Sequence, residues 1–69
     1  MTAREVVGAI LAHGGVKLRQ NGSHARYACA CGQNKTTVPT HPGDLGRGLL
    51  KAIEKDLEPC FGAKWLVGK

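Results

Sequence analysis

The 69-residue sequence has few aromatic residues, few acidic residues and no long apolar run. One Tyr, one Phe and one Trp leave little bulk for a core, which excludes a multidomain protein or an enzyme that encloses a large cofactor. No apolar run approaches the roughly 20 residues that span a bilayer, and we recognise no targeting segment, so we expect a cytoplasmic protein with no membrane partner. Three cysteines are an odd count, which argues against a secreted disulfide framework.

The chain is basic and apolar enough to fold. Ten Lys and Arg residues outnumber five Asp and Glu residues, and 42% of the residues are hydrophobic. This composition predicts a single domain over residues 1–69, in which 58–69 form a short C-terminal extension that packs on the rest through Phe61, Trp65 and Leu66. The positive charge indicates an anionic partner, either a nucleic acid or an acidic protein.

Two segments have the apolar spacing of amphipathic helices. The first begins at Thr2, where Glu5 would complete a capping box, and ends at Gly14-Gly15. The second is expected to begin with Asp44 as its cap and to stop at Pro59. The expected apolar stripes are Ala3, Val6, Val7, Ile10 and Leu11 in the first helix and Leu49, Leu50, Ile53 and Leu57 in the second.

Three short segments between the helices have the alternation of strands. They cover Val16–Arg19, Ser23 to about Cys29, and Lys35–Val38, and Asn21-Gly22 is expected to form a two-residue hairpin turn. The order helix, three strands, helix predicts an α+β domain of two layers, with an antiparallel three-stranded sheet and both helices on one face.

Alternation also assigns a sheet face to each strand residue. The set expected to face the helices is Val16, Leu18, Ala25, Tyr27, Cys29, Thr36 and Val38. The outer face would then show four cations around one histidine, with no carboxylate among them: Lys17, Arg19, His24, Arg26 and Lys35. Such a face is either an ordinary solvated surface or, because ordinary surfaces mix both signs, a site for phosphates.

Three motifs follow one another in this short chain: Gly22-Ser23-His24, then Thr37-Val38-Pro39 with His41 beyond, then Gly48-Leu49-Leu50-Lys51-Ala52-Ile53. This combination resembles the HicA family of toxin–antitoxin mRNA interferases over about residues 3 to 57. The resemblance implies a fold like a double-stranded-RNA-binding domain and RNA cleavage without an obligatory metal. It also implies that the strand-two histidine, here His24, is catalytic, and that a HicB-type antitoxin neutralises the protein.

The implied activity assigns a role to each outer-face residue. His24, kept neutral by the cations near it, would remove the proton of an RNA 2′-hydroxyl, leaving a 2′,3′-cyclic phosphate. The mRNA phosphates would be bound by Lys17, Arg19, Arg26 and Lys35. Ser23 would orient His24 or contact phosphate, or else simply bond within the turn. His41 is a candidate second acid or base, with a turn residue as its alternative, and His13 is interpreted as structural.

The cysteines allow two interpretations. Together with His41, the residues Cys29, Cys31 and Cys60 could hold a structural zinc ion, but a second clear pair of ligands is missing. We therefore expect no cofactor and no metal, with the thiols as small hydrophobes or turn residues. Two other functions stay open: a non-catalytic RNA-binding module on the same fold, and a small zinc-binding interaction protein.

Overall fold

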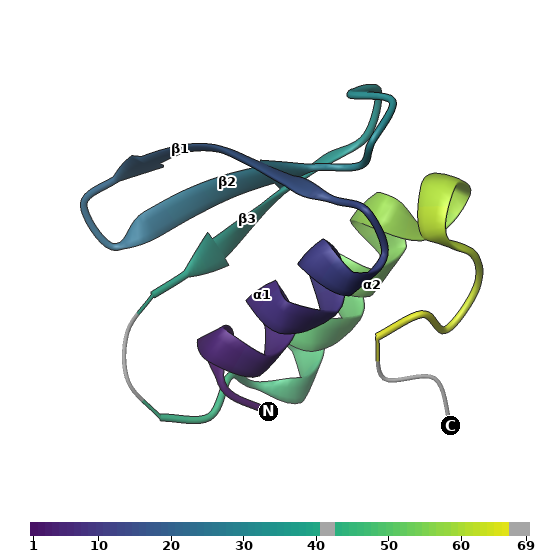
Figure 1. Ribbon diagram of the computed structural model, residues 1–69. Helices are drawn as coiled ribbons and strands as arrows, with labels where there is room; N and C mark the ends of the chain where they lie inside the picture. The colour runs from purple at the N-terminus through teal and green to yellow at the C-terminus, as the bar shows by residue number, and fades with distance from the viewer. Residues whose placement is uncertain (41–42, 67–69) are drawn as a thin grey trace.

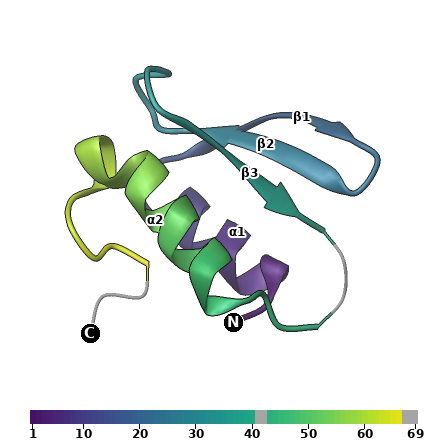
Figure 2. The ribbon, with the colours of Figure 1, turned by 180° about the vertical axis from the view of Figure 1, so that it is seen from behind.

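The computed structural model describes residues 1–40 and 43–66 of the chain. The elements are α1 (Ala3–Ala12), β1 (Val16–Asn21), β2 (His24–Ala28), β3 (Lys35–Pro39) and α2 (Arg47–Phe61). The strands form one antiparallel sheet in the order β1-β2-β3, and both helices lie on the same side of it (Figures 1 and 2). The predicted two-layer α+β fold is confirmed. Neither described helix is long and apolar enough to cross a membrane.

Helix α1 begins as the sequence predicts. The Glu5 amide donates to Thr2 Oγ1 at 3.2 Å, and the Thr2 amide donates to Glu5 Oε1 at 2.8 Å, which completes the capping box. The helix ends at His13, and Gly14 then takes a φ of +87°, which favours glycine. Ala3, Val6 and Ile10 are buried, whereas Leu11, also expected on the apolar face, is 52% exposed.

Helix α2 begins and ends later than predicted. Its N-cap is Gly46, not Asp44. The Asp44 carboxylate instead pairs with the N-terminal ammonium of Met1 at 3.3 Å. Pro59 lies inside the helix, which continues to Phe61. The last turn is held by the Gly62 amide, which donates to the Glu58 carbonyl at 2.8 Å, so the proline in this turn does not end the helix.

The hairpin between β1 and β2 turns at Gly22-Ser23, one residue later than predicted. Asn21 pairs with His24, and these two residues close the loop. Gly22 has a φ of +63°. Ser23 does not have a positive φ, because Lys64 is the single non-glycine residue with one in the part of the chain that the structure describes. Glycine in the first loop position with an ordinary residue in the second is the pattern of a type II′ turn.

Strand β1 contains a bulge that the sequence does not predict. Lys17 is opposite Tyr27, but Arg19 is opposite Arg26, so Leu18 is the extra residue. Because directly paired residues share a face of the sheet, Lys17 lies on the helix side with Tyr27, and Arg19 lies on the outer side with Arg26. The prediction that Lys17 shares the outer face was therefore wrong.

A second contact agrees with this reversal. Lys17 Nζ donates to Gln20 Oε1 at 2.8 Å, and Gln20 is paired with Ala25, which is fully buried on the helix side. Val16 is paired with Ala28, which alternates with Tyr27 and so points to the outer side, although Ala28 itself is fully buried. Val16 and Leu18 are 48% and 47% exposed. The expectation that Val16 and Leu18 face the core was wrong, because the helices contact mainly β3 and all six residues of β1 are exposed.

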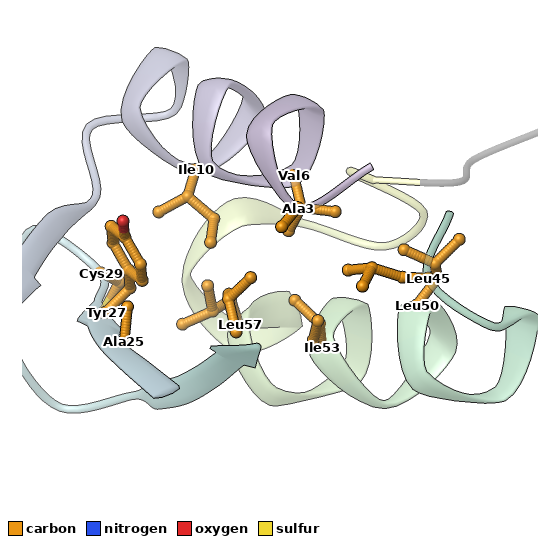
Figure 3. Close-up of a cluster of buried hydrophobic side chains, with 11 residues drawn as sticks. Ala3, Val6, Ile10, Ala25, Tyr27, Cys29, Leu45, Leu50, Ile53 and Leu57 are labelled. Atoms are coloured by element: carbon orange, nitrogen blue, oxygen red, sulfur yellow. The ribbon is translucent and has the colours of Figure 1, made fainter. Parts of the chain in front are cut away.

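The core lies between the sheet and the two helices (Figure 3). Its members are Ala3, Val6, Ile10, Ala25, Tyr27, Cys29, Val38, Leu45, Leu50, Ile53 and Leu57. Thr36 is the one buried polar residue of the described chain, and its hydroxyl donates to Asp56 Oδ2 at 2.9 Å, which joins β3 to α2. The residues of β2 and β3 that were predicted to face the helices are buried, as expected. Leu49, which was expected on the apolar stripe of α2, is 36% exposed.

The residues after α2 return along that helix. Trp65 Nε1 donates to the Glu54 carbonyl at 2.7 Å, and the Leu66 amide donates to Glu54 Oε2 at 3.0 Å. The Trp65 ring also lies edge-on to Phe61, with 5.0 Å between centroids, and His13 stacks on Phe61 at 5.2 Å. The end of α1, the last turn of α2 and the tail therefore meet in one aromatic cluster.

Candidate functional site

The outer face of the sheet carries three rows of paired residues. The rows are Asn21, His24 and Pro39; then Arg19, Arg26 and Thr37; then Val16, Ala28 and Lys35. Arg26 Nη1 donates to Thr37 Oγ1 at 3.1 Å, as expected of side chains that share a face. The four titratable residues of these rows, Arg19, His24, Arg26 and Lys35, are all exposed.

His24 lies at the hairpin end of this face, and two arginines are its nearest charged neighbours in the register. Arg26 is two residues further along β2, about 7 Å away at the rise of a strand, and Arg19 is its partner on β1. Lys35 is one row further from His24. A phosphate next to the His24 imidazole would therefore lie within reach of both guanidinium groups, which bind phosphate through paired N–H donors.

Ser23 and His41 complete the set of residues that the sequence singled out. Ser23 is exposed in the hairpin loop, and its carbonyl accepts a hydrogen bond from the Thr40 amide at 2.7 Å. This bond fixes the loop against the end of β3, so Ser23 and His24 are held at a defined corner of the sheet. His41 lies outside the described residues.

The sheet lacks negative charge. No Asp or Glu occurs between Glu5 and Asp44 in the sequence, so the three strands and the loops between them are free of carboxylates. Four cations lie in that interval, and all five acidic residues belong to the helices or to the segment before α2. An anionic ligand would meet uncompensated positive charge on the sheet side of the molecule.

A second cluster lies at the other end of β2. Cys29 directly follows β2, Cys31 lies in the loop to β3, and Cys60 lies in the last turn of α2. The Sγ atoms of Cys29 and Cys31 are 3.0 Å apart, those of Cys31 and Cys60 are 3.7 Å apart, and all three lie within 4.8 Å of one another. All three are free thiols.

The contacts within the cluster shift the pKa values of two of its thiols in opposite directions. A hydrogen bond from Cys31 is the main cause that lowers the pKa of Cys29 to about 6, and contacts from Cys60 and Asn34 act in the same direction. The pKa of Cys60 is raised to about 11, chiefly by its interaction with Cys29, with desolvation adding to the effect. Of these two thiols, Cys29 is therefore the one that the cluster makes more acidic and Cys60 the one that it makes less acidic.

The comparison with protein families agrees with the motifs around His24. Residues 3–58 match the family described as HicA toxin of bacterial toxin–antitoxin. The chain belongs to the HicA toxin family. No curated protein and no solved structure matches it. The HicA match covers α1, the whole sheet and most of α2, so it includes His24, Arg19 and Arg26 and stops before Cys60.

Two features of the HicA chain were not predictable in full. The bulge at Leu18 removes Lys17 from the outer face, and the alternating pattern of β1 carries no sign of it. From the sequence, Cys29, Cys31 and Cys60 were grouped with His41 as possible zinc ligands, but no metal was expected. The approach of Cys60 depends on α2 continuing through Pro59, which carries the cysteine into the last helical turn.

Proposed function

We propose that this HicA-family protein is an endoribonuclease that cleaves mRNA in the cytoplasm without a metal ion, with His24 as general base. The observation that carries the proposal is an exposed imidazole beside Arg19 and Arg26, on a sheet without carboxylates. A metal-free ribonuclease needs a base for the 2′-hydroxyl and cations for the charge that develops on the phosphate. This corner of the sheet offers both.

The reaction begins when His24 takes the proton of the 2′-hydroxyl. The 2′-oxygen then bonds to phosphorus, the bond from phosphorus to the 5′-oxygen breaks, and a 2′,3′-cyclic phosphate remains. Arg19 and Arg26 bind the non-bridging oxygens, whose charge grows in the transition state. Lys35 and the side chain of Ser23 are proposed to bind flanking phosphates.

The departing 5′-oxygen also needs a proton. Among the described residues no second imidazole shares this face, because His13 is stacked on Phe61 in the helix layer. Water is the proton donor in this scheme, and His41, outside the described residues, is the other candidate. With a single placed base, we expect slow cleavage. It should depend little on RNA sequence, since the outer-face rows contain no Phe, Tyr or Trp ring for base stacking.

The antitoxin is proposed to act on the same face. A HicB-type partner that presents carboxylates to Arg19, Arg26 and Lys35 would compete directly with RNA phosphates. The charge of the sheet therefore supports one surface for both mRNA and antitoxin, used in turn.

One observation favours a non-catalytic RNA-binding module instead. Among the described residues, the exposed His24 side chain has no hydrogen-bond partner that would orient its ring. General bases are usually oriented by a third group, as in catalytic triads. If RNA itself does not align the imidazole, the face binds RNA and does not cut it.

The test is cleavage of an unstructured RNA by the purified chain, freed from antitoxin, with and without excess chelator. His24→Ala is expected to slow cleavage by about 10²–10⁴-fold, with a cyclic phosphate as the wild-type product. Lys51→Ala changes an exposed residue of α2 away from the sheet and serves as the matched control, with an unchanged rate expected. Circular dichroism confirms that each variant is folded.

The outcomes separate the two functions. Cleavage by the wild type and by Lys51→Ala, lost in His24→Ala, supports the nuclease. Intact RNA with a folded wild type, together with binding that survives in His24→Ala, overturns it in favour of the RNA-binding module.

A further inference from the structure

We propose that Cys29, Cys31 and Cys60 form a binding site for one zinc ion, with water in the fourth position. This inference does not depend on the proposed nuclease activity. It rests on three thiols from two distant parts of the chain whose sulfur atoms converge to within 4.8 Å.

The sulfur spacing is close to what zinc requires. Two thiolates at about 2.3 Å from a tetrahedral zinc ion lie about 3.8 Å from each other. The Cys31–Cys60 separation of 3.7 Å already has this value, and the Cys29–Cys31 separation of 3.0 Å needs to open by a fraction of an ångström. A change of that size is within the range of side-chain rotation about Cα–Cβ, and the third pair, Cys29 and Cys60, also lies within 4.8 Å.

The loop that carries two of the ligands is fixed without the metal. The Cys29 amide donates to the Asn34 carbonyl at 3.0 Å, and the Gly32 amide donates to the Cys29 carbonyl at 2.8 Å. Gly32 has a φ of +76°, which allows the tight turn after Cys31. Asn34 Nδ2 also points at Cys29 Sγ at 3.8 Å, the position of an outer donor that stabilises a metal-bound thiolate.

The third ligand comes from a place that favours a cation. Cys60 lies in the last turn of α2, where carbonyl groups without helical partners give the helix end a partial negative charge. For the same reason this end does not favour a bare thiolate at Cys60, and a bound cation would remove that conflict. Zinc suits three thiolates better than magnesium or calcium, which prefer oxygen ligands.

A disulfide explains the cluster less well than a metal. A disulfide would use two of the three thiols and leave the third unexplained, whereas a zinc ion uses all three. The proposed site consists of the three thiols alone; His41 lies outside the described residues.

Zinc binding would link two distant segments of the chain. Cys31 and Cys60 are 29 residues apart in the sequence, so the ion would tie the β2–β3 loop to the end of α2 and to the tail that follows it. Metal binding to the folded state stabilises it against unfolding. A 69-residue domain with a small core has much to gain from such a link.

The test uses the full chain, reduced and stripped of metal, titrated with Zn²⁺ against a chromophoric chelator and separately with Co²⁺. We expect one equivalent of zinc per chain, a thiolate-to-cobalt charge-transfer band, and a rise in Tm on zinc addition. Cys60→Ser and Cys31→Ser are expected to weaken binding by more than about 100-fold, beyond the loss typical of an outer-shell partner. Both side chains are exposed, so the variants should still fold.

Glu58→Ser is the matched control, because it places serine at an exposed position of the same helical end. It should bind zinc like the wild type. A wild type that takes up less than one equivalent under reducing conditions overturns the proposal, and so does a Cys60→Ser variant that binds as tightly as the wild type. The nuclease proposal is tested separately: if the folded, zinc-free chain cleaves RNA, that proposal holds whether or not the chain binds zinc.

Discussion

Arg26 donates a hydrogen bond to Thr37 on the neighbouring strand, with 3.1 Å between Nη1 and Oγ1, two residues from His24 on the same face. The guanidinium is therefore held over the sheet by a neutral partner and keeps its full charge for a ligand. An ion pair with a carboxylate would have neutralised it, and the absence of acidic residues between Glu5 and Asp44 leaves no local competitor.

Arg26→Ala should weaken RNA binding and make it less sensitive to salt. Each lost contact to a single-stranded phosphate should lower the slope of log K against log salt by about 0.7. The measurement is RNA affinity at several salt concentrations, in a His24→Ala background that leaves the RNA intact. Arg4→Ala on α1 removes the same charge from the helix layer, and an equal loss of slope in that variant would contradict a role for the sheet face.

Gly15→Ala should destabilise the fold. A Cβ atom at this position would meet the Ile10 side chain and lie 2.8 Å from the Ile10 carbonyl and 3.1 Å from the Ala28 carbonyl. Overpacking of this kind costs about 1–3 kcal/mol. Gly8→Ala, inside α1 with nothing within 4 Å, should instead stabilise by about 0.5–1 kcal/mol. Urea unfolding of both variants measures the difference, and equal shifts of the same sign would be inconsistent with the close approach at Gly15.

Thr36→Val should cost stability without changing the packing volume. The hydroxyl donates to Asp56 across the β3–α2 contact, and valine cannot replace that donor. Because Asp56 is exposed and regains water, we expect a loss of about 0.5–1.5 kcal/mol in the free energy of unfolding. Thr37→Val on the outer face should stay within about 0.5 kcal/mol of the wild type. If the two variants have the same free energy of unfolding, the hydrogen bond from Thr36 to Asp56 does not stabilise the fold.

Trp65 should stabilise the fold through both its ring and its indole N–H. Trp65→Phe loses the donor to the Glu54 carbonyl and should cost about 1 kcal/mol. Trp65→Ala also loses the contacts with Phe61 and the core and should cost about 2 kcal/mol or more. Denaturant unfolding measures both, with Lys64→Ala as a neutral neighbour. If Trp65→Ala unfolds at the same urea concentration as the wild type, residues after 61 are not part of the folded unit.

The elements predicted correctly are those defined by close neighbours in the chain. The capping box joins Thr2 to Glu5, three residues apart, and the strand order follows from local alternation and turn residues. The same alternation placed His24 and Arg26 on one face, because residues two apart in a regular strand without a bulge point the same way.

The errors occur where a distant contact changes a local preference. Asp44 is 43 residues from Met1 in the sequence, and its carboxylate contacts the N-terminus and does not cap α2. The bulge that moves Lys17 to the other face is set by pairing between β1 and β2, and no residue type in β1 demands it. Val16 and Leu18 are apolar, yet the helices do not reach the strand that carries them.

The cationic face could be predicted from local sequence, whereas the cysteine cluster depends on a distant contact. A run of sequence without carboxylates, folded into alternating strands, was enough to indicate a basic face around His24. The thiol cluster depends on the tertiary structure, because Cys60 comes close to Cys31 only when α2 packs under the sheet and extends past Pro59. Periodicity reports which side of an element a residue occupies, whereas the meeting of two elements depends on how their buried surfaces fit together.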